Sequence, residues 1–199
     1  MRLYCATKNP GKLREFIEIV GDVQALPGLD AIPAPEETGE TFEQNAIDKA
    51  IYYSRFCEGL LFVDDSGIEV DALGGAPGVY SARFAGPNAT DEANNRLLFE
   101  RMSGESNRRA RYVCVVALAA RGELLATFRG EVEGELLEAA RGANGFGYDP
   151  LFHYPPFGRS FGEVSAEEKK QVSHRARALR RMREYLEQSE WSSHLEPTI

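Results

Sequence analysis

The spacing of apolar residues along the chain changes repeatedly between the periods of strands and helices. Short runs of consecutive apolar residues at 3–6 and 60–63 are typical of buried strands. Apolar residues three and four positions apart predict helices over 13–21, 42–51 and 92–102. The buried side of the first is expected to carry Leu13, Phe16, Ile17 and Val20, and Thr41 is expected to cap the second. Because strands alternate with helices, the pattern favours the α/β class.

The C-terminal half of the chain contains longer elements. Two β-rich runs at 112–120 and 124–134 flank Arg121-Gly122-Glu123 and predict a hairpin. Apolar residues at helical spacing predict one long helix over 166–188, followed by a frayed tail after Ser189. Because an antiparallel hairpin lies among parallel-type units, we expect a mixed central sheet in one domain, residues 1–199, with two lobes flanking a cleft.

Composition and charge exclude several classes of protein. The formal net charge of −8 argues against a general nucleic-acid binder, which would concentrate Lys and Arg. The three cysteines are widely separated in apolar surroundings, which indicates buried thiols in a reducing cytoplasm rather than disulfides or a zinc site. No run approaches the roughly 18 apolar residues of a membrane span, and no apolar signal segment is expected. We therefore expect a cytoplasmic protein that binds neither nucleic acid nor membrane.

The turn Thr7–Lys12 separates the first apolar run from the first predicted helix. Such a turn presents free backbone N–H groups, the positive end of a helix dipole and the ammonium of Lys12 to an anion. These features are typical of a phosphate-binding segment, although the spacing is not that of the Walker pattern. Taken alone, Asn-Pro-Gly-Lys also fits a plain turn.

Two acidic pairs are candidates for holding a metal ion. Asp64-Asp65 follows directly after the apolar run 60–63, and we place it at the end of that strand. Neighbouring carboxylates repel each other unless they share a proton or a cation, and Mg²⁺ prefers hard oxygen ligands. An Asx turn with one solvated acid is the alternative. Glu36-Glu37 fits a solvated loop unless the chain folds back toward Asp65.

Two C-terminal segments combine aromatic and charged residues. Phe146-Gly147-Tyr148-Asp149-Pro150 offers rings that stack on a base and a carboxylate fixed before proline, or else a turn with aromatic core anchors. Ser173-His174-Arg175 lies on the predicted long helix, where Lys169 shares a face with Ser173. These side chains suit an anion or a purine edge, although the many arginines nearby also fit a solvated helix surface.

The order of these motifs is more specific than any motif alone. From the N-terminus the chain carries Thr7-Lys8-Asn9 with Lys12, Glu37-Thr38-Gly39, Asn45-Ala46 with Lys49, Asp64-Asp65-Ser66-Gly67, Leu73-Gly74-Gly75-Ala76-Pro77-Gly78, Tyr80-Ser81-Ala82-Arg83, Phe146-Gly147-Tyr148-Asp149-Pro150 and Ser173-His174-Arg175. This combination resembles the inosine triphosphate pyrophosphatase family, whose members are also called dITP/XTP pyrophosphatases or non-canonical purine NTP pyrophosphatases. The resemblance runs from about the second residue to the end of the predicted long helix.

The resemblance implies a fold, an assembly and an activity. The implied ITPase-like fold is α/β, with a mixed central sheet and two lobes flanking a substrate cleft, and the implied assembly is a homodimer. Tyr80 and Phe84 are candidates for an apolar dimer interface, and burial within one subunit is the alternative. The implied activity is hydrolysis of ITP, dITP and XTP to the monophosphate and pyrophosphate with Mg²⁺, which cleanses the nucleotide pool.

The resemblance also implies roles for individual residues. Asp65 would be the catalytic carboxylate and a magnesium ligand, and the second ligand would be Glu36 or Glu37, of which we favour Glu37. A guanidinium such as that of Arg175 can donate to the 6-oxo group of the base, which adenine lacks. The residues expected to bind substrate are Thr7, Lys8, Asn9, Pro10, Gly11, Lys12, Lys49, Ser66, Phe146, Gly147, Tyr148, Asp149, Lys169, His174 and Arg175.

Two other functions fit part of the pattern. One is a nucleotide-binding regulator that does not hydrolyse, but Asp64-Asp65, Lys12 and Lys49 are all present and favour hydrolysis. The other is a Maf-like pyrophosphatase that acts on modified pyrimidine nucleotides. The Phe-Gly-Tyr-Asp and Ser-His-Arg segments favour a purine substrate over a pyrimidine.

Overall fold

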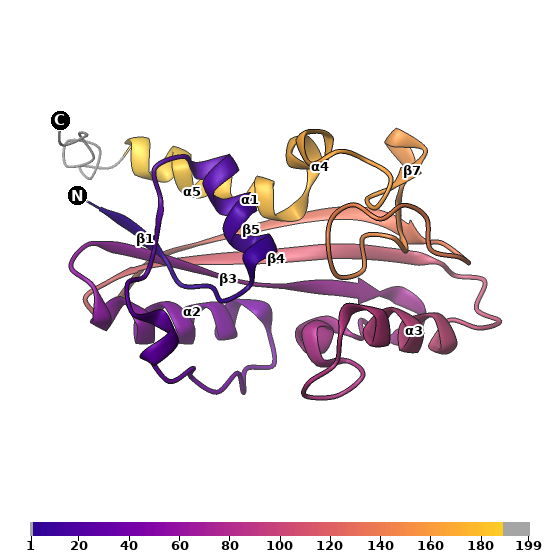
Figure 1. The fold of residues 1–199 in the computed structure, drawn as a ribbon, viewed down its shortest axis with the longest axis horizontal. Helices are drawn as coiled ribbons and strands as arrows, with labels where there is room; N and C mark the ends of the chain where they lie inside the picture. The colour runs from indigo at the N-terminus through magenta and orange to yellow at the C-terminus, as the bar shows by residue number, and fades with distance from the viewer. Residues whose placement is uncertain (1, 189–199) are drawn as a thin grey trace. The chain divides into compact units, whose positions relative to one another are not determined.

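The computed structural model describes residues 2–188, in which seven strands form one mixed sheet (Figure 1). The strand order is β2-β1-β3-β4-β5-β6-β7. β1 pairs in parallel with β2 and β3, whereas β6 pairs antiparallel with β5 and β7. The predicted α/β class and mixed sheet are therefore confirmed. The strands are β1 (Leu3–Cys5), β2 (Gln24–Ala25), β3 (Leu60–Val70), β4 (Arg109–Ala120), β5 (Glu123–Leu136), β6 (Phe152–Tyr154) and β7 (Arg159–Ser160).

The helices begin at residues whose side chains cap their first turns. Asn9, Thr41, Thr90 and Ser165 each accept a hydrogen bond from a first-turn backbone N–H, which would otherwise have no partner in the helix. The helices are α1 (Pro10–Val20), α2 (Phe42–Tyr53), α3 (Asp91–Arg101), α4 (Ala166–Val172) and α5 (His174–Gln188), with short 3₁₀ turns at Leu29–Ala31, Ser54–Phe56, Asp71–Leu73, Gly78–Arg83 and Pro155–Phe157. Within residues 2–188, we find no helix with the length and apolar character that a membrane crossing requires.

The predicted hairpin is present, and its turn explains its geometry. β4 and β5 are joined by Arg121 and Gly122, which both have positive φ, at 51° and 84°. Two successive residues with positive φ form the tight turn whose twist matches that of the flanking strands. Gly122 takes this conformation without a Cβ penalty, so the short connection keeps the two long strands adjacent.

The described chain divides into two compact units. Unit 1 contains residues 2–65, 114–130 and 175–188, and unit 2 contains residues 66–113 and 131–174. The chain passes from one unit to the other within β3, β4 and β5 and after the first residue of α5.

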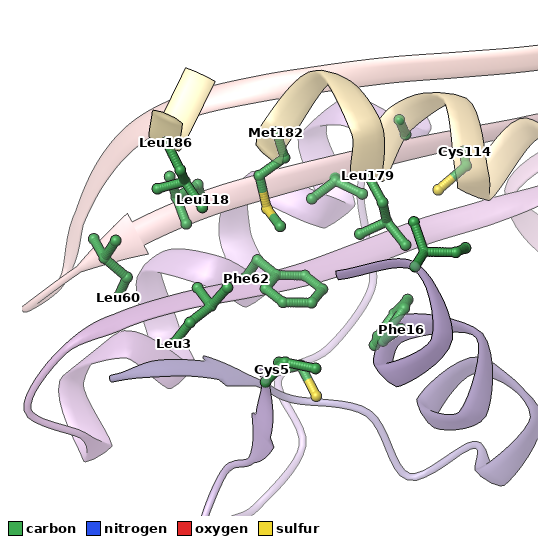
Figure 2. Packing of buried hydrophobic residues seen from close by; sticks show 14 of the residues in the cluster. Leu3, Cys5, Phe16, Leu60, Phe62, Cys114, Leu118, Leu179, Met182 and Leu186 are labelled. Carbon is green, nitrogen blue, oxygen red and sulfur yellow. The ribbon is translucent and has the colours of Figure 1, made fainter. Parts of the chain in front are cut away.

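The core of unit 1 lies between its part of the sheet and the helices α1 and α5, with α2 on the opposite face (Figure 1). The rings of Phe16 from α1 and Phe62 from β3 meet edge to face, with centroids 5.1 Å apart. Leu179 and Met182 from α5 are fully buried in the same cluster (Figure 2). Each such side chain contributes about 1.5–3 kcal/mol by leaving water, so this packing fixes both helices on the sheet.

The core of unit 2 is built around aromatic rings. Tyr112 on β4 and Phe152 on β6 have ring centroids 4.7 Å apart, and Phe161 lies 5.0 Å from Phe152. Leu98 and Met102 bring the apolar side of α3 into the same cluster. The rings thus support the segment before β6, which contains the predicted Phe-Gly-Tyr-Asp loop.

The structure corrects two predicted boundaries near the N-terminus. The first helix begins at Pro10 rather than Leu13, because Asn9 caps it and proline suits the first helical position. Its buried residues are Phe16 and Ile19, whereas Ile17, which we expected in the core, is 48% exposed. The strand predicted to end at Val63 continues to Val70, so Asp64-Asp65 lies inside β3 rather than at its end.

The prediction of one long helix over 166–188 is wrong, because this segment forms two helices, α4 and α5. Ser173 has an extended conformation, φ −63° and ψ 154°, which ends α4 before α5 begins at His174. Val172 packs against the core of unit 2, whereas Ala176 is buried in the core of unit 1. The break therefore serves two different apolar cores. The predicted tail after Ser189 lies outside the described residues.

Candidate active site

The N-terminal turn of unit 1 is organised by Asn9. Its Oδ1 accepts hydrogen bonds from the backbone N–H of Gly11 at 2.8 Å and of Lys12 at 3.1 Å. Thr7 in turn accepts a hydrogen bond from the Asn9 N–H at 3.2 Å. We expected free N–H groups here, but the cap occupies those of Gly11 and Lys12. An anion at this turn must therefore rely on the side chains and the helix dipole.

A hollow of about 350 Å³ lies beside this turn. Residues 7–10 line one part of it, and Leu26, Leu29 and Asp30 line another. Lys8 is exposed and contributes to the lining. The hollow thus brings one cation and the start of α1 to a space large enough for phosphate groups.

Asp64 and Asp65 point to opposite faces of β3, because side chains alternate along a strand. Asp64 shares its face with Leu60 and Phe62, which pack against α1 and α5. Asp65 faces α2. The two carboxylates therefore join two separate clusters and do not need one shared cation to relieve their repulsion.

The Asp64 cluster is a buried chain of ions. The ammonium of Lys12 lies 2.8 Å from Asp64 Oδ1, and Nε of Arg175 lies 3.1 Å from Asp64 Oδ2. Arg175 also contacts Glu15 at 2.5 Å. The side chains of Asp64 and Arg175 are only 2% and 3% exposed. Burial disfavours a charged Asp64, but Lys12 and Arg175 outweigh this effect and hold the pKa of the carboxyl well below its usual range.

The depressed pKa of Asp64 predicts a loss of stability in acid. The unfolded carboxyl has a pKa of about 4, so the stabilisation from its lower folded pKa is complete above that pH and declines as the pH falls toward the folded value. We expect the free energy of unfolding, measured with urea from pH 7 to pH 3, to fall more steeply below about pH 4 for the wild type than for Asp64→Asn. Parallel acid limbs for the two proteins would contradict the pairing.

The Asp65 cluster is centred on Lys49 of α2. The ammonium lies 2.8 Å from Asp65 Oδ1 and 2.6 Å from Glu37 Oε1. Asn45, one turn before Lys49, donates a hydrogen bond to Asp65 Oδ2 at 3.2 Å and accepts one from the Gly39 N–H at 2.8 Å. A Cβ at Gly39 would lie 2.6 Å from Asn45 Oδ1, so only glycine allows this approach. The loop that contains Glu37 and Gly39 therefore folds back toward Asp65, as is required for Glu37 to join the site.

Burial and neighbouring charge act in opposite directions on the pKa values of Asp65 and Lys49, and a different effect prevails at each residue. Burial raises the pKa of Asp65 and outweighs the attraction of Lys49. Burial also acts to lower the pKa of Lys49, but its two carboxylate neighbours, Asp65 and Glu37, outweigh it and raise the pKa to about 12. The lysine is thus held charged, and Asp65 is a stronger base than an exposed aspartate.

In unit 2, the buried carboxylate of Asp149 connects the Phe-Gly-Tyr-Asp loop to two other elements. Its Oδ2 lies 2.7 Å from the ammonium of Lys169 on α4 and accepts a hydrogen bond from the Phe146 N–H at 2.9 Å. Its Oδ1 accepts a hydrogen bond from the Tyr112 hydroxyl at 3.2 Å. The Lys169 ammonium also lies 4.8 Å from the centroid of the Phe146 ring. The loop therefore presents a cation beside an aromatic ring.

Two further aromatic contacts belong to the same part of unit 2. The imidazole of His174 stacks on the ring of Tyr112, with centroids 4.6 Å apart and an interplanar angle of 8°. Tyr148 is buried and donates a hydrogen bond from its hydroxyl to the Ser81 carbonyl at 2.7 Å. Tyr148 thus anchors the loop, and Phe146, which is half-buried, is the more accessible ring.

The structure groups the predicted residues differently from the sequence in one respect. Lys169 and Ser173 were expected to share a face of one helix, but Ser173 is the break between α4 and α5. Arg175 lies in unit 1 with Asp64, whereas Lys169 and His174 lie in unit 2. The predicted site residues that lie in unit 1 are Thr7, Lys8, Asn9, Pro10, Gly11, Lys12, Glu37, Lys49, Asp65 and Arg175. Those that lie in unit 2 are Ser66, Phe146, Gly147, Tyr148, Asp149, Lys169 and His174.

Several partners in these clusters were not predicted as site residues. Glu15 follows Lys12 by three positions, and Asn45 precedes Lys49 by four, so each pair lies on one helix face, a signal that the sequence contains. Tyr112 was predicted only as part of a strand. Its partner Asp149 is 37 residues away, and no local spacing indicates such a contact.

Comparisons with known proteins agree with these features. The sequence pattern of the Ham1 family matches residues 3–185. A dITP/XTP pyrophosphatase from Exiguobacterium is 47% identical over 186 residues, covering 92% of this chain and 95% of the relative. The Ham1 protein of Staphylococcus aureus is 39% identical with a TM-score of 0.85, covering 94% of this chain and 98% of that one. A HAM1 protein from Coxiella burnetii is 36% identical with a TM-score of 0.86, covering 95% and 100% of the respective chains. The chain therefore belongs to the Ham1 family, and the family predicted from the order of its motifs is confirmed.

Proposed function

We propose that this protein is a pyrophosphatase that hydrolyses the non-canonical purine nucleotides dITP, ITP and XTP to the monophosphate and pyrophosphate. The observation that carries the proposal is the cluster of Asp65, Lys49 and Glu37, which combines a base, a cation and a second carboxylate. The names of relatives at 47% and 50% identity, both dITP/XTP pyrophosphatases, support the same activity.

Asp65 is the proposed general base. Its carboxylate accepts a proton from a water molecule that attacks the α-phosphorus, and pyrophosphate leaves as one unit. Asn45 and Lys49 hold the two carboxylate oxygens separately, which fixes the direction of the free lone pairs. Burial raises the pKa of Asp65, and a base with a higher pKa accepts a proton more readily.

Glu37 and Asp65 would hold a magnesium ion. Both carboxylates contact the ammonium of Lys49, so their oxygens already gather around one positive charge, and carboxylate oxygens are the ligands that Mg²⁺ prefers. Glu36 is exposed, which supports Glu37 as the ligand. When bound, the ion would neutralise charge on the phosphate oxygens. Within residues 2–188 no cluster of three or more His, Cys, Asp or Glu side chains is suited to a metal.

The cations of unit 1 are proposed to bind the triphosphate. Lys12 and Lys49 supply positive charge from α1 and α2, and Lys8 contributes from the hollow beside the turn. Residues 7–12 lead through the cap Asn9 into the first turn of α1, where the helix dipole favours an anion. Charge spread over several phosphate oxygens in the transition state requires several such donors.

In unit 2, we propose that the loop Phe146–Asp149, together with Lys169 and His174, recognises the base and sugar. Phe146 supplies an accessible ring for stacking, and Lys169 supplies a donor for a base oxygen. Ser66 continues β3 directly after Asp65 and is proposed to contact substrate. The base-reading role expected of Arg175 does not fit the structure, because its guanidinium is buried against Asp64 and Glu15. We now propose that Arg175 holds the Asp64 cluster in place rather than reading the 6-oxo group.

A substrate panel tests the proposed activity. Purified protein with Mg²⁺ is incubated with dITP, ITP, XTP, dATP and dGTP, with and without added inorganic pyrophosphatase. We expect orthophosphate from the three non-canonical nucleotides only when the helper enzyme is present, because the cut lies between the first and second phosphates. Orthophosphate released without the helper, or equal turnover of dATP, would contradict the proposal.

Homodimer formation and a cytoplasmic location are proposed with the function. Tyr80 is 60% exposed, an apolar ring at the surface that supports an interface with a second copy, whereas Phe84 packs against the core of unit 2. The thiols of Cys5, Cys57 and Cys114 are free, which is consistent with a reducing compartment.

A further inference from the structure

The Phe-Gly-Tyr-Asp loop follows a glycine-rich segment that cannot fix its own shape. Gly142, Gly145 and Gly147 have φ values of 78°, 76° and 63°, in the region that favours glycine. Glycine loses more conformational freedom on folding than any other residue, so ordering this segment carries a high entropic cost. Contacts from other elements must therefore select the observed one.

Helix α3 supplies two such contacts, and both are to Gly147. The Gly147 N–H donates a hydrogen bond to Asp91 Oδ2 at 2.6 Å, and Asn95 Nδ2 donates one to the Gly147 carbonyl at 2.9 Å. Asp91 and Asn95 are four residues apart, so they lie on the same face of α3 one turn from each other. The helix thus holds the glycine by both of its peptide groups.

The clamp complements the anchors elsewhere in the loop. Asp149 is fixed by Lys169 and Tyr112, as described above. The Phe146 N–H is already held by Asp149 Oδ2, and the contacts to Gly147 restrain the next peptide along the loop. Without them, the Phe146 ring would sample a wider range of orientations. α3 is itself held in unit 2 by Leu98, which is fully buried.

We propose that Asp91 and Asn95 are positioning residues for nucleobase binding. They hold Gly147 so that Phe146 lies ready to stack before substrate arrives, which lowers the entropy lost on binding. The inference rests on the proposed role of this loop. It predicts that loss of the clamp weakens substrate binding and leaves the chemistry in unit 1 unaffected.

The test compares Asp91→Ala and Asn95→Ala with matched neighbours. Glu92→Ala is the control for Asp91, because Glu92 is an exposed acid in the same first turn and makes a similar interaction with the helix dipole. Arg96→Ala is the control for Asn95, since Arg96 is exposed one position further along α3. Asp91→Asn keeps an oxygen acceptor and is expected to restore most of the wild-type behaviour.

Two quantities are measured for each variant. Amide hydrogen exchange at Gly147, followed by NMR, is expected to be about tenfold faster in Asp91→Ala, as loss of one hydrogen bond predicts. The KM for dITP is expected to rise about tenfold in Asp91→Ala and in Asn95→Ala, with kcat changed less than about twofold. The two control variants should keep wild-type values of exchange and KM.

The outcomes separate this inference from the proposed function. Phe146→Ala should raise the KM for dITP if the loop binds the base. If it does so while Asp91→Ala and Asn95→Ala leave KM or Gly147 exchange unchanged, the clamp is not a positioning device. If Phe146→Ala leaves KM unchanged, the base-binding role of the loop is contradicted, and Gly147 exchange still shows whether α3 holds the glycine.

Discussion

Replacing Arg175 with methionine is expected to lower the free energy of unfolding by about 3–5 kcal/mol, because it removes one partner of a buried ion pair. Asp64 would keep the ammonium of Lys12 at 2.8 Å but lose its contact with the guanidinium, and Glu15 would lose its contact with the same group. The measurement is urea unfolding at pH 7. Arg183→Met is the control, because Arg183 is an exposed α5 residue paired with Glu187 at the surface, where such pairs contribute less than about 1 kcal/mol.

The same variant distinguishes two roles for Arg175. If the guanidinium stabilises the Asp64 cluster, combining Arg175→Met with Asp64→Leu should recover part of the lost stability, because both buried charges are then removed. The ratio of dITP to dATP turnover by the folded fraction should also stay near that of the wild type. A stable Arg175→Met protein that hydrolyses dATP readily would restore the base-reading role.

Replacing Asp65 with asparagine is expected to lower kcat for dITP by at least about a hundredfold while the fold is retained, as loss of a general base predicts. Asparagine keeps the size of the side chain and one oxygen for Lys49, but it cannot accept the proton. The rate is followed by pyrophosphate release with Mg²⁺, and folding by circular dichroism. Asp48→Asn is the matched control, because Asp48 is an exposed acid on α2 between Asn45 and Lys49. This substitution is expected to leave kcat unchanged.

A near-normal kcat for Asp65→Asn would remove Asp65 from the chemistry. Loss of activity accompanied by unfolding would be a different result, because it would make the Asp65 cluster primarily structural. Activity lost equally in Asp48→Asn would contradict the distinction between the buried and the exposed carboxylate. Kinetic and structural readouts are therefore both needed.

The elements that local periodicity specifies were predicted well. Thr41 caps α2 as expected, and β4 and β5 form the predicted hairpin. The prediction of one long helix was wrong at Ser173, because the helical spacing of apolar residues continues across a break whose two sides pack into different cores. The strand that begins at Leu60 was predicted to end at Val63 but continues to Val70. Two adjacent acids look like a strand end, but each finds a cation on its own face of β3.

The same alternation explains how much of the candidate site the sequence contains. With Leu60 and Phe62 assigned to the face of α1 and α5, the two-residue period places Asp64 there and Asp65 on the other face. Which cation meets each carboxylate is not contained in that period. Lys12 is 52 residues from Asp64, and Arg175 is 111 residues from it, so these pairs depend on the tertiary packing of three elements.

The central claim is that water activated by Asp65 attacks the α-phosphorus, and the site of oxygen incorporation tests it most directly. dITP is hydrolysed by the wild-type protein with Mg²⁺ in water enriched in oxygen-18, and the products are analysed by mass spectrometry. The account predicts label in the phosphate of dIMP and none in pyrophosphate. Label in pyrophosphate would show attack at the β-phosphorus and would contradict the account.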